Sequence, residues 1–134
     1  MRTVGFRTST LVLLLLIAAC TKTQPEPAGT ADQFMRAYFV DDDVAAAVKL
    51  ASGAAKSTLE AALLQIKAAG DSELAQDRPK VRITLIETRV VSTSETGYLY
   101  HVEPEMQGIQ PITVKLNIHK DGNFWTVDDF VQTQ

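Results

Sequence analysis

Six side chains of the sequence could take part in acid–base chemistry, in which a residue carries a proton to or from a reacting atom. A carboxylate or a histidine serves best when burial and its neighbours bring its pKa close to neutrality. The candidates are three tyrosines, two histidines and one aspartate: Tyr38, Tyr98, Tyr100, His101, His119 and Asp128. No acidic residue interrupts an apolar stripe of the sequence, so the pattern predicts no catalytic residue among them.

Four aromatic residues could instead line a pocket for a small ligand: Tyr38, Tyr98, Tyr100 and Trp125. Aromatic side chains belong more often to a core than to a pocket wall, and core packing is the expectation for Tyr38 and Trp125. Tyr98 and Tyr100 are two residues apart in a predicted strand, so they share one face of it, whereas His101 lies on the other. Both histidines are expected at the surface.

The sequence predicts no metal or cofactor site. Asp41, Asp42 and Asp43 are consecutive, whereas a calcium loop spaces its acidic ligands, so we expect these residues to cap a helix instead. Two distant histidines and one cysteine do not make a zinc set, and no glycine-rich phosphate loop is present. The formal net charge is −3 and the basic residues are scattered, which argues against binding of nucleic acid.

The first nineteen residues have the organisation of a signal peptide. Arg2 and Arg7 precede an apolar run at 11–17, and the segment contains no acidic residue. The run is far shorter than the roughly 20 residues that cross a bilayer as a helix. We therefore expect residues 1–19 to be removed. The loss of Arg2 and Arg7 then changes the formal net charge from −3 to −5.

The residues that end this segment, Ile17-Ala18-Ala19-Cys20, resemble the lipobox of bacterial lipoproteins. The resemblance implies cleavage between Ala19 and Cys20 and attachment of lipid to the Cys20 sulfur, which would hold the protein on the periplasmic side of a membrane. Two or three acyl chains anchor a protein stably, since each buried methylene contributes about 0.8 kcal/mol. Thr21 is compatible with delivery to the outer rather than the inner membrane. The alternative is an ordinary secretory signal, with Cys20 unmodified.

Residues 20–30, which contain two prolines, are predicted to form a flexible tether to a single domain over residues 31–134. Thr30 and Gln33 match a capping box and predict the start of a first helix. The three consecutive aspartates favour the start of a second helix, which Gly53 is expected to end. The inward-facing residues of a third helix are expected to be Leu59, Ala62, Leu63 and Ile66.

The period of the apolar residues changes to two after residue 80, which predicts strands. The alternation slips at Leu85-Ile86, as it does at a β-bulge. Residues 92–97 are predicted to be a hairpin connection, and Asp121-Gly122 is a strong two-residue hairpin signal. Four strands in meander order are expected, the second at 98–103 and the last at 124–130.

Helices followed by an antiparallel sheet indicate an α+β fold with the helices packed on one sheet face. The segments at 31–39 (ADQFMRAYF) and 121–130 (DGNFWTVDDF) resemble the opening helix and the last hairpin of nuclear transport factor 2-like domains. The resemblance implies a cone-like fold whose curved sheet and helices enclose a pocket, and a cystatin-like fold is the alternative. Members similar to ketosteroid isomerases, polyketide cyclases or dehydratases use the pocket for catalysis, whereas others bind small ligands or partners.

The expected function is that of a membrane-anchored periplasmic lipoprotein that binds an envelope protein or a small apolar ligand through its domain. The alternative is a pocket enzyme of isomerase, cyclase or dehydratase type. That alternative requires a water-accessible cavity that holds a carboxylate or a histidine beside a tyrosine. A third hypothesis is an accessory role in envelope assembly, which the sequence does not separate from the first.

Overall fold

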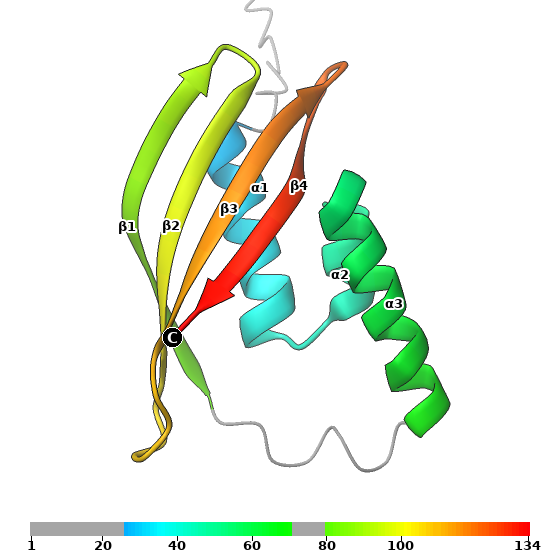
Figure 1. Cartoon of the computed structure of the whole chain (residues 1–134), viewed down its shortest axis with the longest axis vertical. Coiled ribbons are helices and arrows are strands. Elements are labelled where there is room, and N and C mark those ends of the chain that lie inside the picture. Colours follow the sequence, from blue (N-terminus) through cyan, green and yellow to red (C-terminus); the bar gives the residue numbers. More distant parts are fainter. Residues whose placement is uncertain (1–25, 71–79) are drawn as a thin grey trace, which may run out of the picture.

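A computed structural model describes residues 26–70 and 80–134, which form helices and one antiparallel sheet (Figure 1). The helical elements are α1 (Pro27–Met35), the π-helical turn η1 (Arg36–Val40), α2 (Val44–Lys49) and α3 (Gly53–Ala69). The strands are β1 (Val81–Ser92), β2 (Glu95–Pro104), β3 (Ile112–Asp121) and β4 (Phe124–Thr133). They lie in the order β1-β2-β3-β4, which confirms the predicted α+β class and the meander.

Several predicted features lie outside the described residues. These are the signal peptide at 1–19, Cys20, the tether residues 21–25 and the connection 71–79. Their roles therefore stay predictions. Over 26–70 and 80–134, no helix is long and apolar enough to cross a membrane.

Helix α1 begins earlier than the capping-box prediction placed it. Glu26 is the N-cap and Pro27 is the first helical residue, whereas Thr30 is buried within the helix. Proline suits the first turn because its φ is already helical and its missing N–H would have no partner there. Residues 27–30, assigned to the tether from the sequence, thus belong to the folded domain.

The connection between α2 and α3 is held by the edge of the sheet. Asp43 caps α2 as predicted, since its carboxylate accepts a hydrogen bond of 3.0 Å from the Ala46 N–H. The prediction that Gly53 ends α2 is wrong, because α2 ends at Lys49 and Gly53 begins α3 with φ of 54°. The chain leaves the helix so that residues 50–52 can hydrogen-bond to Val127 of β4, through two bonds of 2.8 Å.

The sheet carries the predicted irregularity in β1. The pairing of β1 with β2 shifts between Leu85 and Glu87, which confirms the bulge. The hairpin connection predicted at 92–97 is shorter than expected, since β2 begins at Glu95 and contains Gly97. The second hairpin is confirmed, with Gly122 at φ of 61° in the turn, a backbone angle that glycine adopts readily.

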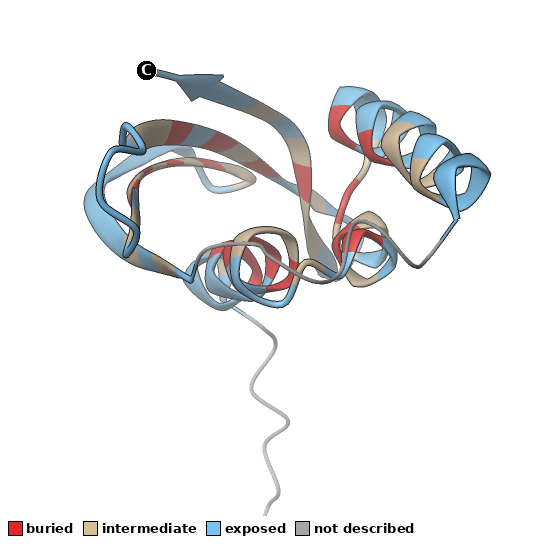
Figure 2. Ribbon diagram, turned by 90° about the horizontal axis from the view of Figure 1, so that it is seen from below, coloured by how far each residue is buried: buried red, intermediate tan, exposed pale blue. Residues whose placement is uncertain are grey.

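The core lies between α1 and one face of the sheet, and Figure 2 shows the buried parts of both on facing sides. Alternate residues of β2 and β3 point into it: Tyr98, Tyr100, Val102, Val114, Leu116 and Ile118. The opposite face of these strands, here called the outer face, carries polar residues that include His101, Lys115 and Asn117. Helix α3 packs beside β4 and directs Leu59 into the core, as predicted.

Candidate functional site

The space between α1 and the sheet is filled with aromatic and apolar side chains. Phe34 is completely buried and stacks on Tyr38, with ring centroids 6.2 Å apart. The Phe34 ring also contacts Phe130 of β4 at 5.4 Å, and Met35 beside it is fully buried. In the described residues, the buried polar side chains other than tyrosine are those of Thr30 and Thr96. The interior is therefore a packed core rather than an open cone.

Tyr98 and Tyr100 belong to this core. They lie on one face of β2, as predicted, and their ring centroids are 6.5 Å apart. Burial, and then the charge of Asp32 and the neighbouring Tyr98, raises the pKa of Tyr100 to about 12. Burial also raises the pKa of Tyr98. Both phenols hold their protons at neutral pH, so they could donate a hydrogen bond but could not act as bases.

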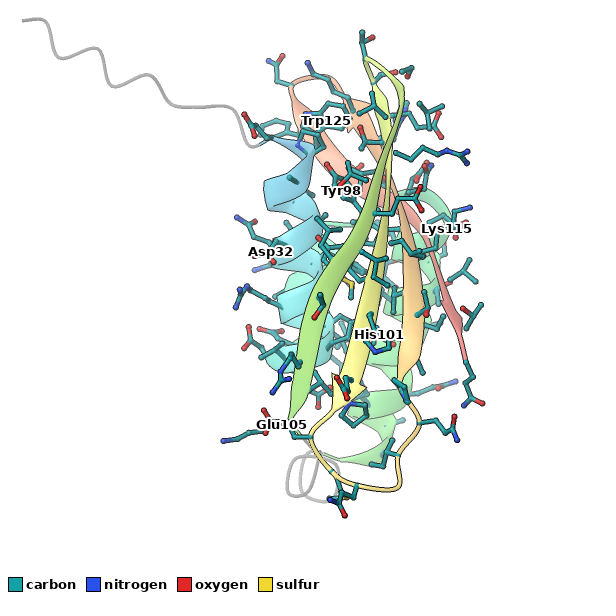
Figure 3. The ribbon with its side chains drawn as sticks, turned by 90° about the vertical axis from the view of Figure 1, so that its left-hand side faces the viewer. Asp32, Tyr98, His101, Glu105, Lys115 and Trp125 are labelled. Carbon is teal, nitrogen blue, oxygen red and sulfur yellow. The ribbon has the colours of Figure 1, made fainter. Side chains whose placement is uncertain are left out.

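The other two aromatic candidates are partly buried and pack against this core, as expected from the sequence. Tyr38 is half-buried in η1, where its ring meets the edge of Phe39 at 4.8 Å. Trp125 is half-buried near the turn between β3 and β4, and Lys120 Nζ lies 5.9 Å from the centroid of its ring. Figure 3 shows Trp125 and Tyr98 at separate positions along the sheet. The structure thus brings Tyr98 and Tyr100 together and leaves Tyr38 and Trp125 apart from them.

The histidines and Asp128 do not form a catalytic group. His101 and His119 are on the outer face of β2 and β3, where sequence alternation placed them. Asp128 accepts a hydrogen bond of 2.9 Å from the Asn117 amide and therefore ties β4 to β3. Among the described residues, no three His, Cys, Asp or Glu side chains gather closely enough to hold a metal ion.

A hollow of about 450 Å³ opens on the outer face of the sheet, over β1, β2 and β3. Gly97 lies within β2 at this point and has no side chain to fill the space. Leu99 and Val91 supply apolar surface, and the charged lining residues are Glu87, Arg89, Glu95 and Lys115. We call this the outer-face hollow. In Figure 3, Lys115 lies on the opposite side of the sheet from Asp32 of α1.

This hollow was not predicted, because Gly97 was assigned to a turn from the sequence. The signal was available in the alternation of β2, in which the glycine occupies the same face as Leu99 and His101. A glycine inside a strand often marks a place where another molecule or backbone approaches closely.

A second recess of about 640 Å³ lies between η1, α2, α3 and the start of β1. Its lining is mainly apolar, with Phe39, Val44 and Ile66 among its residues. Tyr38 and Asp42 also line it. Asp42 is half-buried and has φ of 53°, an uncommon backbone angle for a residue other than glycine. We call this recess the α3 groove.

The fold has a known structural counterpart. An NTF-2-like protein of unknown function from Shewanella oneidensis MR-1 superposes with a TM-score of 0.58, over 80% of this chain and 95% of that chain. The two sequences are 12% identical, so the likeness concerns the fold alone. It confirms the nuclear transport factor 2-like architecture expected from the sequence. No protein-family model and no curated protein matches the chain.

Proposed function

We propose that this protein is a lipid-anchored envelope protein whose domain binds a protein partner or a small ligand. The observation that carries the proposal is the filled interior, where Phe34, Met35 and Phe130 occupy the space that a pocket enzyme would keep open. The accessible recesses lie instead at the surface of the domain. A fold of this kind serves many functions, so the proposal rests on these sites and not on the architecture.

The membrane anchor in this proposal is lipid on Cys20, after cleavage between Ala19 and Cys20. The support is the lipobox and the short apolar run before it. Metabolic labelling with a fatty acid tests it: wild type is expected to take up label and Cys20→Ser is not. Equal labelling of the two proteins contradicts the anchor. Membrane fractionation of the wild type then tests the outer-membrane location that Thr21 favours.

The outer-face hollow is the proposed binding surface. It combines apolar side chains with both signs of charge in a recess whose volume is within the range of ligand sites. A photo-crosslinking residue in place of Leu99 is expected to capture a bound molecule in intact cells. The same residue in place of Asn123, an exposed turn position outside the hollow, serves as the control.

A valine at position 97 tests the hollow without weakening the sheet. The Cβ of a residue at this position meets the Arg89 and Leu116 carbonyl oxygens at 3.8 Å, an ordinary contact, and the backbone there does not require glycine. Valine also favours strands. Gly97→Val is therefore expected to keep the fold, measured by circular dichroism, and to abolish capture at position 99. In the chain that keeps Gly97, recovery of uncrosslinked monomer alone from both the position 99 and the position 123 proteins would count against a binding function for this surface.

The α3 groove supports the alternative, a pocket enzyme. A tyrosine and a carboxylate, Tyr38 and Asp42, both line this recess. A screen of small apolar carbonyl compounds and esters, followed by product analysis, tests for turnover. Activity that Tyr38→Phe or Asp42→Asn removes, with the fold intact, favours the enzyme. If no compound is turned over, or if turnover is unaffected by both substitutions, the result contradicts the enzyme alternative and favours the binding function.

A further inference from the structure

The two edges of the sheet differ in how they are protected. Residues 50–52 cover part of the edge of β4 that faces away from β3, by hydrogen-bonding to Val127. Strand β1, twelve residues long, is the other edge, and within the described residues no segment pairs with its free side. An uncovered edge strand presents unpaired N–H and C=O groups that can pair with another chain.

This edge also carries exposed apolar residues between positions 85 and 91 of β1. Four large hydrophobic side chains there are exposed, with Val90 at 74% and Ile86 at 55%. The other two are Leu85 and Val91. Proteins usually protect such an edge with charges, prolines or a covering segment, so this strand has the features of an interaction surface.

The sequence of the edge is symmetric in its chemistry about Thr88. Polar, apolar, apolar and charged residues precede it in the order Thr84, Leu85, Ile86, Glu87, and the mirror order follows it as Arg89, Val90, Val91, Ser92. The charge changes sign across the centre, from Glu87 to Arg89. A segment of this kind is complementary to a second copy of itself when the two run antiparallel.

From Glu87 to Arg89, the faces of the sheet are consistent with that pairing. Glu87 and Arg89 lie opposite Leu99 and Gly97 of β2, so both are on the outer face, whereas Thr88 lies opposite Tyr98 and is on the helix face. The bulge at Ile86 produces this placement, because it puts Glu87 on the face opposite to Leu85. A two-fold axis perpendicular to the sheet keeps each face on its own side.

We propose that two copies of this chain pair antiparallel through β1, with the two-fold axis at Thr88. In that register Glu87 faces the partner's Arg89 on the outer face, and Arg89 faces the partner's Glu87. Ile86 then lies next to the partner's Val90 along the paired strands. Neither Glu87 nor Arg89 makes an ion pair within the described part of the chain, where Arg36–Asp32 is the one salt bridge. The result is a continuous eight-stranded sheet.

Disulfide trapping in the full chain tests the register. Directly opposed residues of antiparallel strands have Cβ atoms about 4.5–5.5 Å apart, close to the spacing of a disulfide. Thr88→Cys is therefore expected to give a covalent dimer under mild oxidation. Thr84→Cys is the matched control: it is exposed on the same strand, but the proposed register puts its two copies about 27 Å apart. Dimers that form through Cys20 appear equally in wild type and both variants.

Charge reversal tests the complementarity. In the Thr88→Cys background, Glu87→Arg or Arg89→Glu places like charges opposite each other twice across the axis. Each is expected to weaken dimerisation about tenfold, and the double reversal to restore it. A Thr88→Cys chain that stays monomeric, a Thr84→Cys chain that dimerises as readily, or single reversals without effect would each overturn the proposal. The outcome is independent of whether Cys20 carries lipid.

Discussion

Replacement of Phe34 by alanine tests whether the filled interior holds the domain together. Phe34 is completely buried between α1 and the sheet and contacts the rings of Tyr38 and Phe130. Loss of a buried phenylalanine removes its transfer free energy and leaves a cavity, which together cost about 3–5 kcal/mol. A domain of this size has a free energy of unfolding of roughly 5–15 kcal/mol, so the variant should keep half of it or less if the wild type lies at the low end of that range.

Urea denaturation followed by far-ultraviolet circular dichroism measures this difference. Phe124→Ala is the matched control, because Phe124 is the same residue type but 68% exposed in β4. The control is expected to lose no more than about 0.5 kcal/mol. If the two variants lost similar stability, or if Phe34→Ala lost less than about 1 kcal/mol, the interior would not be the packed core described above. The result would then favour an accessible pocket between α1 and the sheet.

Three further predictions concern the backbone, a helix cap and a buried phenol. Gly53→Ala should lower the free energy of unfolding by roughly 1–2 kcal/mol, because φ of 54° is unfavourable for alanine. Gly29→Ala, inside α1, should raise the free energy of unfolding by about 0.5 kcal/mol. Thermal denaturation of both variants shows whether the two changes have opposite signs. Asp43→Ala should cost about 1 kcal/mol in urea denaturation through loss of the cap on α2, and Asp43→Asn should retain most of it. The raised pKa of Tyr100 stabilises the folded state fully below the ordinary tyrosine pKa near 10, and this contribution is lost as pH rises toward 12. The free energy of unfolding should therefore fall less between about pH 10 and 12 in Tyr100→Phe than in wild type.

Local pattern predicted the elements of this fold well where the side chains themselves decide the structure. Alternation in β2 and β3 separated the tyrosines from His101, and the slip at Leu85-Ile86 marked the bulge. The three aspartates at 41–43 were predicted to cap a helix from their type and position alone, and Asp43 does so. In each case the relevant interaction spans only a few residues of the chain or one strand face.

The predictions failed where residues far apart in the sequence meet. The end of α2 depends on the hydrogen bonds between residues 50–52 and Val127. The residue types around Gly53 do not predict this pairing with a distant strand. The packing of Phe34 against Phe130 depends on the position of α1 over β4 and could not be predicted from either segment. Gly97 was assigned to a turn by its residue type, whereas the pairing of β1 with β2 placed it in a strand.

The early start of α1 limits how far the domain can stand from a membrane. With lipid on Cys20, as proposed, only seven residue steps separate the anchored residue from Pro27, or roughly 25 Å at full extension. That reach is less than the length of β2, about 33 Å for its ten residues. The domain would therefore act as a short-range surface element, which meets molecules that diffuse along or arrive at the bilayer and does not search the depth of the periplasm.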